Sequence, residues 1–276
     1  MENEQCNSCP SGSSCGGSCP SAPAELTAAQ KASNIKNMIA IMSGKGGVGK
    51  SSLTAMLAVA LREKGFSVGV LDADVTGPSI PRLFGLSESV TSGEDGLEPV
   101  LTGSGLKIMS LNLMTPTDDT PVVWRGPMVS QLVEQFRTEV VWGELDYLLV
   151  DLPPGTGDIQ ISVFQSFPLA GVVTVTNPQQ LAGMIVRKSV HMLNLYKLKN
   201  YGLIENMAWL QCPDCGKKVP LFGQARGEEE AAREGIPFLG ALPLDPALTA
   251  AADSGRIEEY RSEAFQAIAD KIIAAV

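Results

Sequence analysis

A glycine-rich segment between an apolar run and a helical pattern constrains the fold more than any other part of the sequence. Residues 43–52 read SGKGGVGKSS, and Gly44, Gly49, Lys50 and Ser51 fit the pattern G-x-x-x-x-G-K-[ST]. Glycines let a backbone wrap around phosphates, and the N–H groups that open the following helix favour negative charge. The lysine then reaches the β- and γ-phosphates, and the serine hydroxyl binds Mg²⁺. A nucleotide site is predicted, because a glycine-rich turn that fits by chance does not explain the strand before it and the helix after it.

The elements around this loop predict an α/β fold. Helical patterns cover residues 50–65, 128–139, 179–196 and 258–275. Short apolar runs typical of buried parallel strands occupy residues 37–43, 67–74, 106–113, 145–152, 171–177, 199–206 and 237–243. Their alternation predicts a mostly parallel, doubly wound sheet with helices on both faces, as in P-loop NTPases, formed by one domain over residues 34–276.

Composition limits the partners and the location. Residues 1–33 are rich in Ser, Gly, Pro and Cys, which predicts a flexible tail unless a metal orders it. The net charge of −9 argues against nucleic acid as a partner. Since no apolar run approaches the ~20 residues of a membrane span, and no export signal is visible, we expect no membrane partner and a cytoplasmic location.

A second lysine, Lys45, lies five residues before Lys50. Near the start of the loop it is poorly placed to reach the γ-phosphate of its own chain. It could instead cross a two-fold axis and add positive charge to the nucleotide of a partner subunit, as a trans-acting arginine does. A solvated lysine without such a role is the alternative. The trans interpretation predicts a homodimer.

Several segments resemble known families. GKGGVGKS resembles the deviant Walker A motif of the MinD/ParA and nitrogenase iron-protein class of ATPases, in which the extra lysine acts across a dimer. From about residue 39 to residue 245 the chain resembles the Mrp/ApbC/Nbp-type iron–sulfur cluster carriers. The motifs that carry this second resemblance are DADVTGPSIPRLFG at 72–85, WRGPM at 124–128, DYLLVDLPPGTGD at 146–158 and ENMAWLQCPDCG at 205–216. The resemblance implies a homodimeric ATPase that passes a 4Fe–4S cluster to apo-proteins.

The resemblance also implies roles for individual residues. Asp72 and Asp74 belong to switch I, Asp74 orients the hydrolytic water, and Asp151 is the Walker B aspartate near Mg²⁺. Asn206 contacts the adenine. From the residues alone, carboxylates beyond the ends of parallel strands can position Mg²⁺ and water, while a turn-stabilising role is the alternative for Asp74. The predicted ATP-binding residues are Gly44, Lys45, Gly46, Gly47, Val48, Gly49, Lys50, Ser51, Ser52 and Asn206, and the catalytic ones are Lys45, Lys50, Asp74 and Asp151.

Cys212 and Cys215 form a C-x-x-C motif after an apolar run. A redox pair and half of a zinc site are both open interpretations. One motif supplies two thiolates, whereas zinc and iron–sulfur sites usually need four ligands, which two chains around a two-fold axis would provide. The resemblance implies a bridging 4Fe–4S cluster at this place, and a structural zinc is the alternative.

A second set of cysteines lies in the tail. Cys6, Cys9, Cys15 and Cys19 have the spacing C-x2-C-x5-C-x3-C, enough ligands for another iron–sulfur site. Some members of the family share the C-x2-C-x5-C core, but their fourth cysteine usually lies well upstream, where this chain has none. A flexible tail that binds metal only transiently is the alternative.

The sequence departs from the carrier family at two further places, and a rival function has to be considered. Ile185 stands where many family members have aspartate, and QARGEEE at 224–230 replaces a glycine-rich run. The single histidine, His191, is expected to be structural. The rival is a MinD/ParA-like spatial organiser without a cluster, which predicts a basic patch or a membrane-binding helix. The C-terminal segment 257–276 is amphipathic but not basic, and this rival gives Cys212 and Cys215 no role.

Overall fold

The apolar run before the glycine-rich loop forms a central strand of the sheet. In the computed structural model this strand, β1 (Asn34–Ser43), is buried on both faces along its second half. Ile39 and Ile41 pack into one hydrophobic core, and Met38, Ala40 and Met42 pack into a second core on the opposite face. Because successive side chains of a strand point to opposite faces, an uninterrupted apolar run is what a strand between two helical layers requires.

The structure describes residues 26–74, 77, 79–114, 126–179 and 182–276. These form an 8-stranded sheet of order β12-β9-β8-β1-β7-β2-β6-β5, in which only the edge pair β5–β6 is antiparallel. The predicted mostly parallel α/β fold is confirmed. The other strands of the sheet are β2 (Val68–Asp72), β5 (Val100–Leu101), β6 (Lys107–Ser110), β7 (Glu144–Asp151), β8 (Gly171–Thr176), β9 (Asn200–Glu205) and β12 (Phe238–Ala241).

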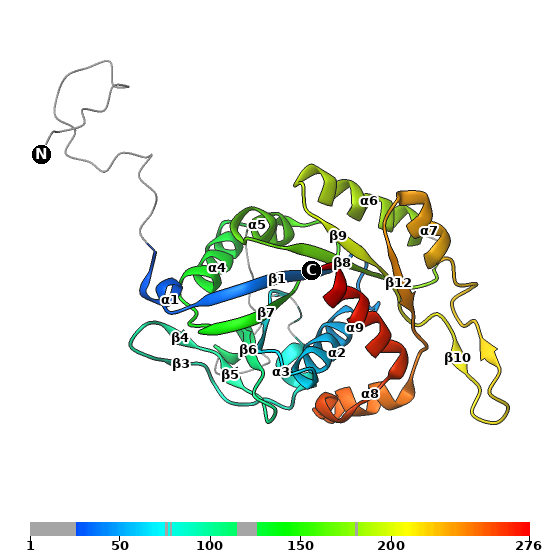
Figure 1. Cartoon of the computed structure of the whole chain (residues 1–276), viewed down its shortest axis with the longest axis horizontal. Helices are drawn as coiled ribbons and strands as arrows, with labels where there is room; N and C mark the ends of the chain where they lie inside the picture. Colours follow the sequence, from blue (N-terminus) through cyan, green and yellow to red (C-terminus); the bar gives the residue numbers. More distant parts are fainter. Residues whose placement is uncertain (1–25, 75–76, 78, 115–125, 180–181) are drawn as a thin grey trace, which may run out of the picture.

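Helices cover both faces of this sheet (Figure 1). One face carries α2 (Lys50–Glu63), α3 (Ile80–Leu83), α8 (Pro246–Asp253) and α9 (Glu263–Ala275). The opposite face carries α4 (Gly126–Thr138), α5 (Asp158–Ser166), α6 (Ala182–Leu195) and α7 (Gly227–Glu234). Two small antiparallel pairs lie outside the main sheet: β3 (Thr91–Ser92) with β4 (Leu97–Glu98), and β10 (Leu210–Gln211) with β11 (Lys218–Val219).

Several elements differ from the expected ranges. The run 106–113 is a strand only over β6 and continues as the 3-10 turn η1 (Leu111–Leu113). The helix expected over 258–275 is divided into η2 (Ile257–Glu259) and α9, because Ser262 caps the N-terminus of α9 through the N–H of Phe265. Helices α3, α5, α7 and α8 lie outside the ranges that were predicted to be helical.

A short helix precedes residue 34, where the domain was expected to begin. Helix α1 (Ala28–Lys31) lies within the range assigned to the tail, carries a capping box at Thr27 and buries Ala29. Cys6, Cys9, Cys15 and Cys19 lie outside the described residues, so a flexible segment that carries these cysteines stays a prediction. In the part of the chain that the structure describes, no helix is long and apolar enough to span a bilayer.

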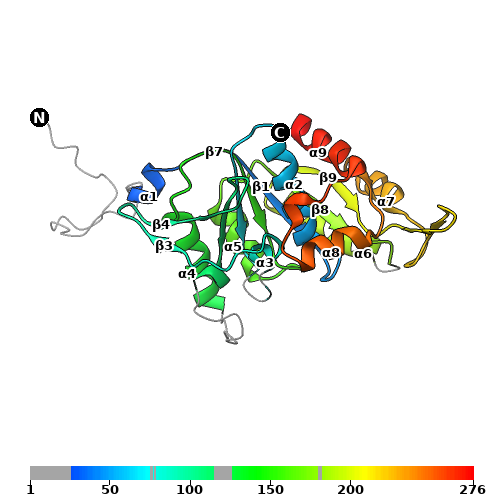
Figure 2. The ribbon, with the colours of Figure 1, turned by 90° about the horizontal axis from the view of Figure 1, so that it is seen from below.

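The carboxyl ends of the parallel strands meet at one edge of the sheet. Asp72 and Asp151, the last residues of β2 and β7, are direct partners in the strand register. The glycine-rich loop follows β1 at the same edge, and the segment that carries β10 and β11 follows β9. Figures 1 and 2 both show this segment, in yellow, projecting from the domain beyond α7.

Candidate nucleotide and cysteine sites

The glycine-rich loop joins β1 to α2 as predicted. Gly47 and Gly49 have positive φ angles of 75° and 81°, which glycine adopts without strain. A Cβ atom on Gly49 would lie 2.3 Å from Nδ2 of Asn206, so a side chain there would displace the asparagine. Beside the loop is a cavity of about 220 Å³, and its lining consists of Ser43, Gly46, Gly47, Val48, Gly49, Lys50, Ser51, Ser52, Asp74 and Pro154.

Asp151 is the centre of the polar contacts at the start of α2. Its carboxylate is fully buried and lies 2.7 Å from the ammonium nitrogen of Lys50, which is 6% exposed. The hydroxyl of Ser51 donates to the same oxygen, Oδ2, at 2.6 Å, and the hydroxyl of Thr54 donates to Oδ1 at 2.7 Å. The structure thus brings together three predicted site residues and adds Thr54, which lies outside the sequence pattern of the loop.

Asp72 connects the two ends of the segment that follows β2. Its Oδ1 accepts the N–H of Asp74 at 3.1 Å, and its Oδ2 accepts the N–H groups of Ser79 and Ile80 at 2.9 and 3.0 Å. Complete burial, together with the nearby charge of Asp151, raises the pKa of Asp72 to about 7. Asp72 therefore holds Asp74 beside the phosphate-binding loop, a role that sequence spacing alone did not reveal.

Lys45 is exposed and contacts its own chain. Its ammonium group donates to the side-chain oxygen of Gln179, in the segment after β8, and its carbonyl accepts the hydroxyl of Ser43 at 3.0 Å. Ile185 of α6 lies so close to the loop that a Cβ on Gly44 would be 1.9 Å from its Cγ2. A trans role for Lys45 stays a prediction.

Asn206 supports the glycine-rich loop from the neighbouring strand end. Its side chain is 3% exposed, and its Nδ2 donates to the carbonyl of Val48 at 2.9 Å. Its own N–H donates to the carbonyl of Thr176 at the end of β8. The amide nitrogen of Asn206 is thus committed to the loop, and an adenine contact stays a prediction.

Cys212 and Cys215 lie in the turn between β10 and β11. The N–H of Cys212 donates to the carbonyl of Lys217, and the N–H of Gly216, which has a φ of 68°, donates to the carbonyl of Cys212. Both cysteines are free thiols; Cys215 is exposed and Cys212 is half-buried. Hydrogen bonds from the N–H groups of Cys215 and Asp214 and from the Cys215 thiol lower the pKa of Cys212. A lower pKa favours the thiolate, the form that binds metals.

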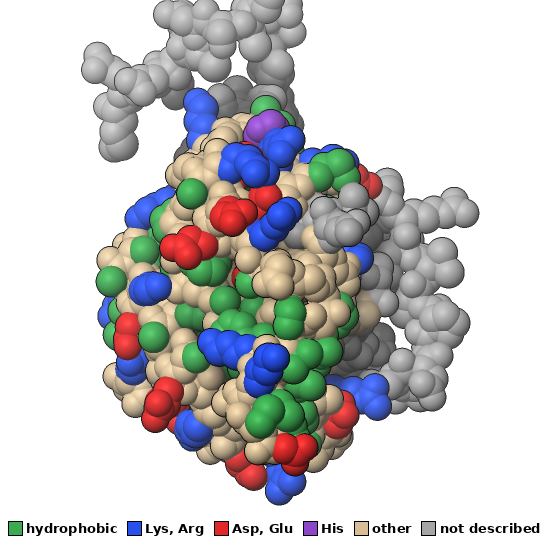
Figure 3. All heavy atoms as spheres, turned by 90° about the vertical axis from the view of Figure 1, so that its right-hand side faces the viewer, with side chains coloured by type: hydrophobic (Ala, Val, Ile, Leu, Met, Phe, Trp, Pro, Cys, Tyr) green, Lys and Arg blue, Asp and Glu red, His purple; other side chains and the backbone are tan. Residues whose placement is uncertain are grey.

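The surface around this turn is apolar and basic. Val219, Leu221 and Phe222 are 38–47% exposed, and the ammonium of Lys218 lies 4.0 Å from the ring centroid of Trp209. Figure 3 views the side of the molecule that carries β10 and shows hydrophobic side chains beside Lys and Arg side chains. Within the described ranges, no group of three or more His, Cys, Asp or Glu residues could hold a metal ion.

Three other features of the sequence are the WRGPM motif, the segment 224–230 and His191. Residues 124 and 125 of WRGPM lie outside the described residues. The segment 224–230 leads into α7, and its residue Arg226 donates its N–H to Oε1 of Glu205 at 3.0 Å. His191 is exposed on α6.

Comparison with known proteins agrees with this geometry. The model of the ParA family described as NUBPL iron-transfer P-loop NTPases matches residues 34–276. An iron–sulfur cluster carrier protein of Clostridium perfringens is 46% identical, covering 92% of each chain, and one of Methanocaldococcus jannaschii is 43% identical, covering 98% of this chain and 95% of the relative.

Solved structures show the same fold. A nucleotide-binding protein from Archaeoglobus fulgidus in complex with ADP has a TM-score of 0.75 and 44% identity, covering 84% of this chain and 91% of that one. The cell-division ATPase MinD of Pyrococcus furiosus, at 22% identity and a TM-score of 0.65, covers 87% of this chain and 100% of its own, and it shares the fold. The matched family, the relatives and the placement of Lys50, Asp151 and the cysteine turn agree: this chain belongs to the Mrp/NUBPL-type iron–sulfur cluster carrier proteins of the ParA-like P-loop NTPases.

Proposed function

We propose that two copies of this chain hold one 4Fe–4S cluster between their cysteine turns, hydrolyse ATP and pass the cluster to apo-proteins. The observation that carries the proposal is the combination of a buried Lys50–Asp151 phosphate site with an exposed pair of thiols on the same domain. The named function of the relatives, iron–sulfur cluster carriers, supports the cargo. The ADP complex of the Archaeoglobus protein supports the nucleotide.

Hydrolysis would use the residues around Asp151. Lys50 would bind the β- and γ-phosphates, while Ser51 and Asp151, whose oxygens are 2.6 Å apart, would hold Mg²⁺ directly or through water. The ion neutralises the charge that develops on the phosphate oxygens. Asp74 lines the same cavity as Lys50 and would orient the attacking water, held in place by Asp72. Lys45 would act on the nucleotide of the partner subunit.

The ligand count supports a cluster shared by two chains. Each cysteine turn provides two thiols, and a 4Fe–4S cluster takes about four. Cys215 is exposed, so a second copy can approach it, and the lowered pKa of Cys212 favours the thiolate that the iron binds. We propose that the apolar residues Val219, Leu221 and Phe222 surround the shared cluster and limit its contact with water.

The two sites are connected through the end of β9. Asn206 donates to the glycine-rich loop at Val48, and the chain reaches Cys212 six residues later. The root of the cysteine turn is held where the N–H of Leu244 donates to the carbonyl of Trp209. A change of the loop on binding or hydrolysis of ATP would therefore be transmitted along residues 206–212 and alter the affinity for the cluster.

The other predicted features fit around this core. The four tail cysteines would hold a second cluster, and the partners would be apo iron–sulfur proteins, with no nucleic acid or membrane involved. A spatial organiser of the MinD/ParA kind shares the fold, but it has no use for the exposed thiol pair of Cys212 and Cys215. The cytoplasm is the proposed location.

Anaerobic reconstitution with iron and sulfide tests the proposal. The full chain should become brown and transfer its cluster to an apo-acceptor, with a rate that changes when ATP is present. The variant Cys212→Ser/Cys215→Ser should lose transfer. A matched variant with serine at Cys6, Cys9, Cys15 and Cys19 should keep transfer from the cysteine turn. Zinc binding without an iron–sulfide chromophore at Cys212 and Cys215 would overturn the proposal.

A further inference from the structure

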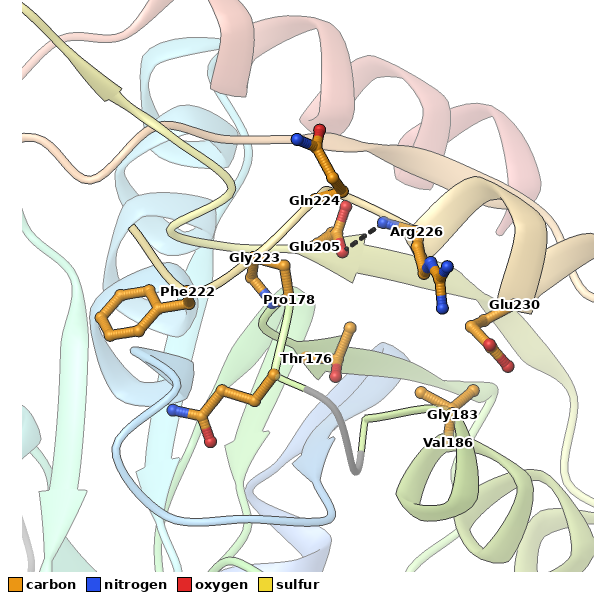
Figure 4. A pocket seen from close by; sticks show the side chains of 12 residues that line it. Thr176, Pro178, Gly183, Val186, Glu205, Phe222, Gly223, Gln224, Arg226 and Glu230 are labelled. Carbon is orange, nitrogen blue, oxygen red and sulfur yellow. Dashed lines mark hydrogen bonds between the residues drawn. The ribbon is translucent and has the colours of Figure 1, made fainter. Parts of the chain in front are cut away.

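A second cavity lies at the carboxyl ends of β8 and β9, on the face that carries α6 and α7. It has a volume of about 310 Å³ and shares no lining residue with the phosphate-binding cavity. Figure 4 shows Thr176 and Glu205 coming from the sheet, Val186 from α6, and Arg226 and Glu230 from the opposite wall. Ligands of doubly wound sheets bind beyond the carboxyl ends of the strands, so this position suits a binding site.

The wall formed by residues 222–227 is fixed at several points. Gly223 has a φ of 110°, and a Cβ atom there would lie 3.2 Å from the carbonyl oxygen of Pro178. The N–H of Arg226 donates to Oε1 of Glu205 at 3.0 Å. A Cβ atom on Gly227 would lie 2.8 Å from Cβ of Glu205, so the backbone presses directly against the end of β9. The cavity is therefore formed by packed backbone and needs no large rearrangement to accept a guest.

Glu205 is an unusual residue to find in such a wall. Its side chain is only 2% exposed, and no ion pair of the described residues includes it. The hydrogen bond that its carboxylate accepts at Oε1 comes from a neutral donor, the N–H of Arg226. Burying a carboxylate without a cation is costly, so buried charges in proteins are normally paired.

The neighbouring carboxylates do have cations. Glu230, on the same cavity, receives both of its contacts from the guanidinium of Arg233, at 2.9 and 3.0 Å. Glu234 pairs with Arg187 at 3.3 Å. Arg226 lies at the rim with an exposed side chain, and its guanidinium makes no ion pair with a described residue. Among the described residues, Glu205 is thus the buried carboxylate of this cavity that has no ion-pair partner.

We propose that this cavity binds an organic cation, a primary amine or guanidinium group, whose charge pairs with Glu205. The aliphatic stem of the guest would lie against Val186, and the amide oxygen of Gln224 would accept a further hydrogen bond from its cationic group. A free small molecule and a basic side chain of a protein partner both offer this chemistry. The site goes beyond the carrier function, since it uses neither the phosphate-binding loop nor the cysteine turn.

The test measures binding to the full chain at low salt, without nucleotide or cluster. Butylamine and a blocked Gly-Lys-Gly peptide are the cationic probes, and butanol is the neutral probe of similar shape. Amide shifts of Gly223, Arg226 and Gly227 in the NMR spectrum, followed by titration, give the affinity and its location. The probe that binds more tightly identifies the source, a free amine or a protein side chain.

Three variants decide the outcome. Glu205→Gln keeps an acceptor for the N–H of Arg226 and should lower the affinity by about tenfold, because it removes the charge. Glu228→Gln, an equal charge change on the exposed face of α7 and outside the cavity, should leave it unchanged. Gln224→Glu, at an exposed lining position, should raise the affinity by about two- to fivefold even if Glu205→Gln folds poorly.

Three results would overturn the proposal. The first is that neither cationic probe binds below about 20 mM. The second is that butanol binds as tightly as butylamine, and the third is that Glu205→Gln binds the amine like the wild type. Since the assay involves neither iron nor ATP, its failure would leave the proposed carrier function untouched.

Discussion

Lys50 and Asp151 form a buried ion pair, with Nζ and Oδ2 2.7 Å apart and side chains 6% and 0% exposed. They come from different elements, the first residue of α2 and the last of β7, so the pair joins the phosphate-binding loop to the sheet. The hydroxyls of Ser51 and Thr54 complete the shell around the carboxylate. Removing either charge would leave the other buried without compensation.

This pair predicts a combined loss of activity and stability. Lys50→Ala should abolish ATP turnover and also reduce the free energy of unfolding by about 3–5 kcal/mol, because Asp151 loses its cation. Lys64→Ala removes a lysine from an exposed pair with Asp270, where the side chains are 33% and 61% exposed, and should cost less than about 1 kcal/mol. Urea unfolding and ATPase rates measure both effects. Normal turnover in Lys50→Ala would contradict the phosphate-site assignment.

Lys45 should act across the dimer. Lys45→Ala is expected to bind ATP normally but to hydrolyse it slowly, because the positive charge reaches only the partner's nucleotide. In a dimer of one Lys45→Ala chain and one Lys50→Ala chain, one site keeps both its own Lys50 and the partner's Lys45. Titrating one variant into the other should partly restore turnover. If mixed dimers form and turnover stays absent, the trans role is wrong.

The cluster should stabilise the dimer. Cargo that needs ligands from two chains binds only the dimer and must therefore shift the equilibrium toward it. Sedimentation of the anaerobically loaded chain should show tighter association than that of the unloaded chain, with about four irons per two cysteine turns once the tail cysteines are replaced by serine. Cys215→Ser should remove this difference. ATP binding should be unaffected, because Cys215 lies outside the phosphate-binding cavity.

Asp72 should make the protein less stable as pH rises. Its pKa is about 7 in the folded chain against an ordinary value of 3.8. Between these two values the folded chain holds a proton that the unfolded chain has released, so the contribution of Asp72 to stability falls as pH increases and then stays low. Asp72→Asn should flatten the dependence of the unfolding free energy on pH in this window.

Asp146 provides a control, because its pKa is shifted in the opposite direction to that of Asp72. Lys36 and Ser67 donate to its carboxylate and lower its pKa from 3.8 to about 2. Its stabilising effect is therefore present above pH 3.8 and is lost as pH falls toward 2. Asp146→Asn should therefore lower the free energy of unfolding by a constant amount between pH 4 and 7, and it should alter the dependence of stability on pH only in acid. If the free energy of unfolding of Asp72→Asn varied with pH between 4 and 7 just as that of the wild type does, Asp72 would not be a buried carboxyl that titrates near pH 7.

The sequence predicted the parallel sheet because its strands are buried on both faces and read as uninterrupted apolar runs. It predicted the loop from Gly44 to Ser51 because that chemistry depends on neighbouring residues. It did not predict the role of Asp72, since the partners Ser79 and Ile80 become apparent only when the loop closes on itself. Contacts between distant segments, such as Lys45 with Gln179, depend on the packing of β8 beside β1 and have no local pattern.

The cysteine turn stands apart from the hydrogen bonding of the main sheet. Strands β10 and β11 pair with each other, and β10 touches the rest of the domain through a bridge from Leu210 to Leu244. The hydrophobic cores contain neither Cys212 nor Cys215. Small metal-dependent domains unfold when a chelator removes their ion, because the ion replaces a core. Under the proposed function, a chelator should therefore remove the cluster and leave the domain folded, so that the same chain can be loaded again.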